Sequence, residues 1–300
     1  MRRTHANKGF AVLALTAVFT ACVLVAAAGA ALARSAAPVK KPVFAGSFYP
    51  ADSVSLQTVV DGYLRDAERV GDVPPGVFAV IAPHAGYIYS GKTAAYSYNA
   101  ARGKGITTVI LLGPSHRSSF SGIALYPSGT WETPLGKVPV DTAMGRKVAS
   151  LCGAVKDNPG AFDEEHSLEV QLPFLQRTLK DFKIVPLLTG ALERKDMETL
   201  SDSLATILKQ HRGKVLLVVS SDMSHYHPYS EAVRMDSSTL RFVADLDAAG
   251  LIDGLAKREN ELCGATAVAA SMMAAAKLGA QAQVLHYTNS GDTAGDRTRV

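Results

Sequence analysis

The sequence predicts an α/β protein whose central sheet is largely parallel and covered by helices on both faces. Short runs of β-branched and other apolar residues recur along the chain, and helical patterns of apolar residues lie between them. Continuous apolar strands that alternate with helices are typical of parallel sheets buried on both faces. Neither internal repeats nor a second domain are evident, so the sequence predicts a single domain over residues 43–300.

The elements are expected in a regular order along this domain. Strands are predicted at 78–81, 108–112, 122–126, 183–188, 214–219 and 282–287. Helices are predicted near 92–101, 141–151, 167–180, 195–211, 230–247 and 265–278. Residues 296–300 resemble the start of a further strand, which would be truncated.

The first 33 residues resemble a targeting segment and not a part of this fold. Three basic residues within the first eight precede an apolar run over 9–33 that ends in Ala-Leu-Ala. This pattern predicts a signal peptide cleaved near Ala33, and therefore an exported protein that is periplasmic or extracellular. The apolar run is also long enough to act as an uncleaved membrane anchor, which is the alternative. A linker is predicted at 34–42.

Outside this leader the chain carries almost no net charge. Of 31 basic and 27 acidic residues, three basic and no acidic ones lie in 1–33, so 28 and 27 remain, a net charge of +1. This balance gives no support for nucleic-acid binding, and no nucleic-acid partner is expected. Contact with a membrane is expected only through an uncleaved N-terminal segment.

Three of the predicted strands are each followed by a histidine. His84 follows the strand at 78–81, His116 follows 108–112, and His225 follows 214–219 within the stretch SSDMSHYHPY. Ligands of open α/β sheets bind at the carboxyl ends of the strands, so parallel strands would place these histidines on one side of the molecule. A single histidine in such a loop is more often structural, but three together favour a functional site.

The same stretch contains Asp222 and His227 beside His225. From the residues alone, Asp222 and His225 fit metal ligation, proton transfer, or a structural role as polar residues that end a strand. His227, which precedes Pro228, fits a structural role as well as a functional one.

Two helix starts add further candidates. Glu165 and His166 lie in an acidic segment that opens the predicted helix at 167–180, with Asp163 or Ser167 as its N-cap. Cys263 lies at the start of the helix at 265–278, where the helix N-terminus would lower the pKa of its thiol and suit it as a nucleophile or ligand. The alternatives for Cys263 are a small buried residue or a disulfide with Cys152.

Eight motifs over about residues 42–300 resemble those of the Memo family, also called AmmeMemoRadiSam system protein B. They are AGSFYP (45–50), PHAGYIYSG (83–91), GPSH (113–116), WETPLG (131–136), EEHSLEVQLPFLQ (164–176), SSDMSHY (220–226), CG (263–264) and YTNSGD (287–292). In bacteria and archaea, proteins of this family accompany an AMMECR1 domain and a radical-SAM protein, which implies a functional link to both. The family fold is similar to that of class III extradiol dioxygenases (the LigB-like fold), which use non-haem iron.

The resemblance also implies roles for individual residues. His84, His116 and Cys263 match the three metal-ligand positions, and His225 matches the catalytic histidine of the dioxygenases, with Asp222 near it. Glu165 and His166 are then candidates for a supporting shell or substrate pocket. Three aromatic residues near the motifs, Tyr87, Trp131 and Tyr226, are further candidates for that pocket.

These observations favour a Memo-like metal-binding protein with oxygen or redox chemistry on a small substrate. Iron or copper is the expected metal, and zinc is the alternative. Non-haem iron oxygenases usually present two histidines and a carboxylate, so a cysteine at position 263 makes metal binding a firmer expectation than dioxygenase turnover. Two other functions stay open: a zinc-dependent hydrolase, and a non-enzymatic module that binds a peptide or small molecule in the same crevice.

Overall fold

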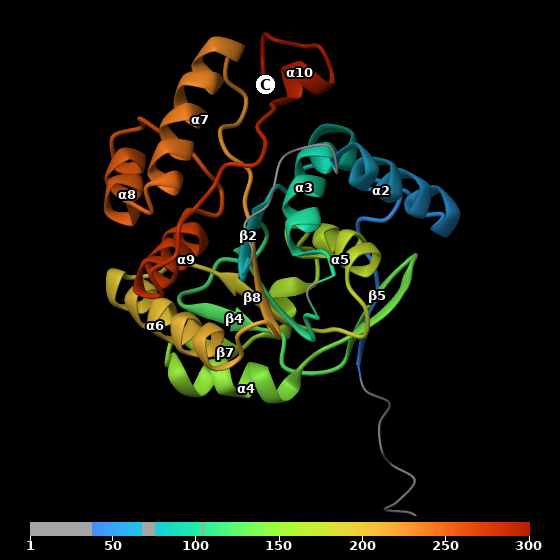
Figure 1. Ribbon diagram of the computed structural model, residues 1–300, viewed down its shortest axis with the longest axis vertical. Helices are drawn as coiled ribbons and strands as arrows, with labels where there is room; N and C mark the ends of the chain where they lie inside the picture. The colour runs from blue at the N-terminus through green and yellow to red at the C-terminus, as the bar shows by residue number, and fades with distance from the viewer. Residues whose placement is uncertain (1–37, 68–75, 104) are drawn as a thin grey trace, which may run out of the picture. The chain divides into compact units, whose positions relative to one another are not determined.

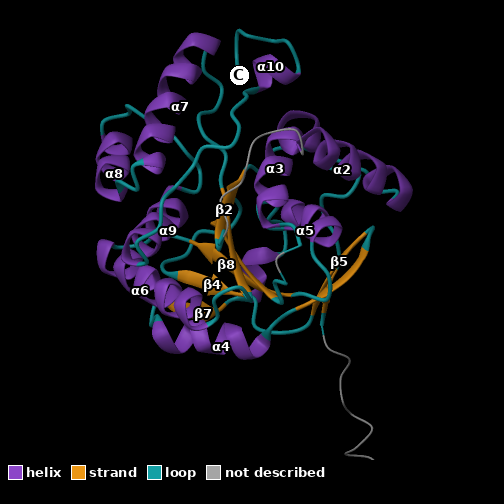
Figure 2. Cartoon of the chain, viewed as in Figure 1, coloured by secondary structure: helices purple, strands orange, loops and turns teal. Residues whose placement is uncertain are grey.

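Six strands form the central sheet of the computed structural model, which describes residues 38–67, 76–103 and 105–300. The strand order is β2-β9-β3-β8-β4-β7, and every neighbouring pair is parallel except β4 and β8. The strands are β2 (Ala79–Ala82), β3 (Thr108–Pro114), β4 (Ile123–Leu125), β7 (Val155–Asp157), β8 (Lys183–Thr189) and β9 (Val215–Ser220). Figure 2 shows this sheet with helices on both sides, so the predicted α/β fold with a largely parallel sheet is confirmed.

The central strands are apolar throughout because both of their faces are covered. All seven residues of β3 are buried, and successive side chains point to opposite faces. Val109 and Leu111 belong to one hydrophobic core, and Ile110 and Leu112 belong to the other. The unbroken apolar run in the sequence therefore serves two cores at once.

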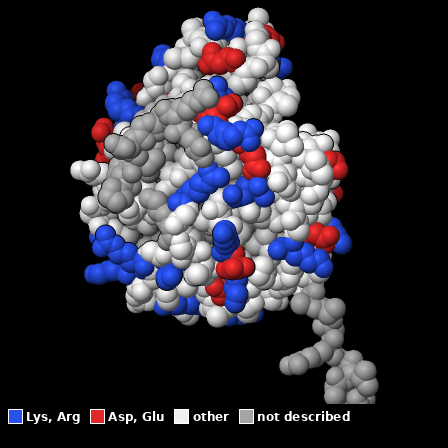
Figure 3. All heavy atoms as spheres, turned by 45° about the vertical axis from the view of Figure 1, so that its right-hand side comes forward, with Lys and Arg blue, Asp and Glu red and all other residues white. Residues whose placement is uncertain are grey.

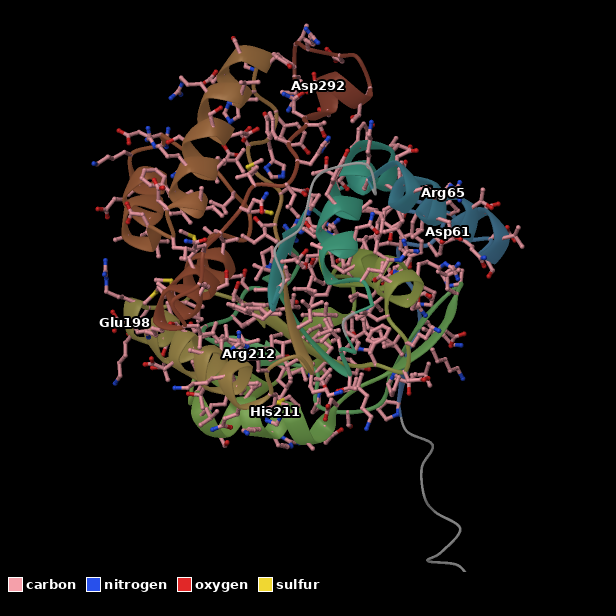
Figure 4. The ribbon with its side chains drawn as sticks, in the orientation of Figure 1. Asp61, Arg65, Glu198, His211, Arg212 and Asp292 are labelled. Carbon is pink, nitrogen blue, oxygen red and sulfur yellow. The ribbon has the colours of Figure 1, made fainter. Side chains whose placement is uncertain are left out.

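Two groups of helices complete these cores (Figure 1). The first core contains residues of α2 (Ser53–Ala67), α3 (Tyr87–Ala101) and α5 (Leu172–Thr178); the second contains residues of α4 (Thr142–Leu151), α6 (Arg194–Gln210) and α9 (Ala265–Lys277). Asp61, labelled on α2 in Figure 4, accepts two hydrogen bonds of 2.8 and 2.9 Å from Arg177 of α5. The helix α8 (Ala248–Ala256) packs against α9, and α7 (Tyr229–Ala244) packs against α8.

A second, three-stranded sheet was not expected from the sequence. It pairs β1 (Val39–Lys40) in parallel with β5 (Thr130–Thr133), which forms a hairpin with β6 (Gly136–Pro139). Gly136 has a φ of +120° at the start of β6, where the chain reverses, a conformation that glycine adopts without strain. Strand β7 was not expected either; it is only three residues long, which leaves little pattern to detect.

The structure corrects the predicted strand at 282–287 and the predicted helix at 167–180. No strand forms at 282–287; this segment runs as a loop into α10 (Ser290–Thr293). Side-chain contacts hold it in place of a backbone ladder, with His286 stacked on Tyr96 at a centroid distance of 4.1 Å. The helix predicted at 167–180 begins only at Leu172, after a 3-10 turn, η2 (Glu169–Gln171), because Ser167, one of the two expected caps, donates its hydroxyl to the carbonyl of Pro114 instead.

The predicted leader at 1–33 lies outside the described residues. Among the helices of the described part, none is both long and apolar enough to cross a bilayer.

Residues 296–300 form no strand, and Val300 instead pairs with His227 through two backbone hydrogen bonds of 3.1 and 2.9 Å. On the face shown in Figure 3, basic and acidic side chains are interspersed.

Candidate metal centre

The carboxyl ends of neighbouring parallel strands bring the motif residues together. Ala82 at the end of β2 pairs in register with Ser220 at the end of β9, so the segments after them start side by side. His84 follows β2 and Asp222 follows β9, and the backbone N–H of His84 donates to Asp222 Oδ1 at 2.7 Å. His116 follows β3, which lies on the other side of β9. Parallel pairing therefore concentrates these residues at one edge, as predicted.

Three imidazoles converge at this edge. His84, His116 and His166 each offer one ligand atom, and these atoms lie within 4.8 Å of one another. The ring centroids are 5.1 Å apart for His84 and His116, 5.2 Å for His84 and His166, and 4.6 Å for His116 and His166. Imidazole nitrogens suit zinc, copper, iron and nickel, and three ligands from the protein leave coordination positions open for water or substrate.

A buried carboxylate holds His116 in place. Glu165, only 1% exposed, accepts hydrogen bonds from the backbone N–H of His116 at 2.5 Å and of Ser167 at 2.8 Å, and its Oε1 lies 2.9 Å from His116 Nδ1. Burial opposes ionisation of Glu165, but the hydrogen bonds from His116 and Ser167 outweigh it and lower its pKa to about 2. Because an ionised carboxylate only accepts, His116 carries a proton on Nδ1 and keeps Nε2 for a ligand.

The other two imidazoles are neutral at pH 7. Burial lowers the pKa of His84, and the Asp222 carboxylate only partly offsets this effect. Burial and the nearby His84 lower the pKa of His166 to about 4. Neutral imidazole is the form that binds a metal, so the surroundings favour the ligating state of both residues.

His166 is held by ring contacts more than by hydrogen bonds. Phe44 and Phe48 pack against its ring at centroid distances of 5.5 and 4.8 Å, and His116 stacks on it with an interplanar angle of 27°. Its buried Nδ1 has no hydrogen-bond partner among the described residues, and the 3.5 Å separation from Glu165 Oε1 is too long for one. An orphaned nitrogen in a group of three imidazoles fits a site that takes up a metal ion.

Cys263 lies next to His84, but its thiol differs from the expectation. Its Sγ is 3.1 Å from His84 Nε2 and accepts the backbone N–H of Asp222 at 3.2 Å. Burial, followed by the Asp222 carboxylate, raises the pKa of this thiol to about 12, so the predicted lowering by the helix N-terminus is wrong for the protein without a metal. Cys152 and Cys263 are free thiols, and the alternative of a disulfide between them is not realised.

His225 has a different carboxylate partner from the one expected. Asp222 binds the backbone N–H groups of His84 and Ala85, at 2.7 and 3.3 Å. The Nδ1 of His225 instead lies 3.5 Å from Glu261 Oε1, which also accepts the His225 backbone N–H at 3.1 Å. His227 Nε2 lies 2.8 Å from the other oxygen of Glu261. No sequence pattern indicated Glu261, because α7 and α8 separate it from His225 along the chain.

Two of the three aromatic candidates are buried in the core, and the third lies beside His225. Tyr87 is buried and donates its hydroxyl to the carbonyl of Val170 at 2.6 Å. Trp131 of β5 is buried in the core against Phe162, with centroids 5.8 Å apart. Tyr226, by contrast, is 70% exposed beside His225. Phe44 and Phe48, which were not among the candidates, pack against His166 as described above.

Comparison with known proteins identifies the family of this chain. The family model described as Memo-like protein matches residues 40–300. A MEMO1 family protein of Methanopyrus kandleri is 33% identical over 273 residues, which cover 87% of this chain and 95% of the relative. MEMO1 family proteins of Thermoplasma volcanium and Saccharolobus solfataricus are 34% and 35% identical, covering 87% and 86% of this chain and 95% of each relative. This chain therefore belongs to the Memo family.

Proposed function

We propose that this protein binds iron or copper at the strand edge and carries out oxygen or redox chemistry on a small oxygen-containing molecule. The observation that carries the proposal is the convergence of His84, His116 and His166 within 4.8 Å, with the Cys263 thiol 3.1 Å from His84. In this proposal His84 and His116 are metal ligands in either case. The third ligand is His166 or Cys263.

The donor types support this choice of metals. Imidazole suits iron, copper and zinc alike, whereas thiolate softness favours copper(I) and zinc or changes the properties of iron. A bound iron or copper ion would supply Lewis-acid or redox chemistry at the open positions. The high pKa of Cys263 means that its ligation would release a proton to a base or to solvent.

The chain's own residues then have separate tasks. Asp222 fixes the backbone at His84 and so orients the start of the ligand loop. His225, with about a third of its side chain exposed, is the candidate for holding or moving a proton of the substrate, and Glu261 orients its ring. Buried Glu165 keeps His116 in one orientation.

A zinc hydrolase is the second candidate, because three histidines are also a common ligand set of catalytic zinc. Metal analysis of protein purified with and without oxygen, followed by oxygen-uptake assays with catechols and hydrolysis assays with esters and amides, separates the two. Iron or copper with oxygen uptake supports the first proposal. Zinc with hydrolysis supports the second, and protein that takes up no metal contradicts both.

A further inference from the structure

A buried chain of hydrogen bonds lies behind His84, on the side of Nδ1. It consists of Tyr98 from α3, Gln171 from η2, Ser220 at the end of β9 and the carbonyl of Ser167. We infer that this chain fixes the proton of His84 on Nδ1, so that Nε2 is the atom that His84 offers to a metal ion. Ser220 and Gln171 are then positioning residues of the proposed metal site, and this last step rests on the proposed function.

The donors and acceptors around Ser220 decide the position of the proton. A serine hydroxyl has one hydrogen to donate and two lone pairs that accept. Ser220 Oγ donates its hydrogen to the carbonyl oxygen of Ser167 at 2.6 Å, a group that only accepts. Ser220 Oγ also accepts a hydrogen bond from Gln171 Nε2 at 2.9 Å. One lone pair remains for His84 Nδ1 at 2.8 Å, so Nδ1 must be the donor.

The orientation of the Gln171 amide is fixed independently. Its Nε2 donates to the carbonyl of Pro83 at 3.0 Å and makes a longer contact of 3.3 Å with the carbonyl of Ser167, and its Oε1 accepts the hydroxyl of Tyr98. Turning the amide over would place Oε1 against the carbonyl oxygen of Pro83, with no proton between them. Gln171, Ser220 and Ser167 are all at most 1% exposed, so water cannot replace a missing partner cheaply.

The surroundings of the other nitrogen agree with this assignment. His84 Nε2 faces Cys263 Sγ at 3.1 Å, and the nearest Asp222 oxygen lies 3.9 Å away, beyond hydrogen-bond distance. No carboxylate therefore holds a proton on Nε2 among the described residues. In the opposite tautomer, the lone pair of His84 Nδ1 would face Ser220 Oγ. Ser220 could donate to this lone pair only by withdrawing its proton from the Ser167 carbonyl.

His84 therefore needs no change of tautomer before its Nε2 binds a metal ion. Partners of ligating histidines that fix the tautomer typically change metal affinity by about 10–100-fold when they are removed. Ser220→Ala deletes the acceptor of Nδ1 and leaves Gln171 its bond to Pro83. We therefore expect this substitution to weaken zinc binding by about 10–100-fold.

The test is nitrogen-15 NMR of metal-free protein labelled at histidine, with the His84 signals assigned through His84→Gln. We expect a protonated Nδ1 and an unprotonated Nε2 in the wild type, and a mixture of tautomers in Ser220→Ala. Ser203→Ala is the matched control, because Ser203 is also buried and donates to a backbone carbonyl, that of Thr199, on α6. It should leave the His84 signals and the zinc affinity unchanged.

A wild-type His84 with its proton on Nε2 overturns the inference, and this result does not depend on the folding of any variant. Unchanged His84 signals and unchanged zinc affinity in folded Ser220→Ala overturn it as well. Zinc titration of the wild type gives a separate answer. Absence of zinc binding contradicts the zinc hydrolase, and absence of binding of zinc, iron and copper alike contradicts the proposed function. The tautomer measured in the same metal-free sample still decides the inference.

Discussion

Replacing Glu165 with Gln should destabilise the metal-free protein at neutral pH and do so much less in acid. The pKa of this buried carboxyl is lowered from its ordinary 4.5 to about 2 in the folded protein. The folded state therefore prefers the ionised form, and the difference corresponds to roughly 3 kcal/mol of stability at pH 7. This contribution is complete above about pH 5 and is lost as the pH falls through 2, leaving roughly 1 kcal/mol at pH 3.

Urea unfolding at pH 7 and pH 3 in the presence of a chelator measures the contribution of ionised Glu165 to the unfolding free energy. The loss in unfolding free energy caused by Glu165→Gln should shrink by more than half between the two pH values. Glu164→Gln is the control, because Glu164 is the exposed neighbour of Glu165 and should change stability little at either pH. An equal loss at both pH values would refute the argument that the ionised carboxylate holds His116.

Three further predictions concern other parts of the molecule. Tyr49→Phe removes a 2.8 Å hydrogen bond to the buried Glu169 carboxylate, so it should lower the unfolding free energy by about 1.5–3 kcal/mol. Urea titration measures this loss, and no change would mean that the bond is not formed in solution. At pH 8, iodoacetamide should alkylate Cys263 far more slowly in native metal-free protein than in unfolded protein, because the pKa of the native thiol is about 12. Rapid reaction of the native protein would contradict a buried, protonated thiol. His225→Ala should keep the metal content of the wild type while turnover falls by about 10²–10⁴-fold, and loss of metal in this variant would instead make His225 a ligand.

The sequence predicted the residues whose positions follow from strand order. His84 and His116 come directly after apolar runs, and parallel pairing places such residues at one edge whatever the details of the loops. The alternation within β3 likewise determines which residues enter each core. These features depend on local pattern and on a general rule of parallel sheets, and so a single sequence reveals them.

The parts that the sequence did not reveal depend on contacts between distant segments. The pairing of His225 with Glu261 requires the path of α7 and α8, which no local pattern specifies. The thiol of Cys263 was expected to respond to the helix beside it, but burial and Asp222 have the larger effect. The apolar residues at 282–287 suggested a strand, whereas ring stacking on Tyr96 holds that segment as a loop.

Titration of metal-free protein with Co²⁺, followed by absorption spectroscopy, tests the central claim most directly. The account predicts about one equivalent bound by the wild type and at least 100-fold weaker binding by His84→Ala and His116→Ala. His211→Ala is the control, because His211, labelled in Figure 4, ends α6 just before the amino end of β9, whereas the site lies at the carboxyl ends of the strands. A sulfur-to-cobalt charge-transfer band would identify Cys263 as the third ligand, and its absence would identify His166. Stoichiometric binding that survives both His84→Ala and His116→Ala, or a wild type that binds no cobalt, would contradict the account.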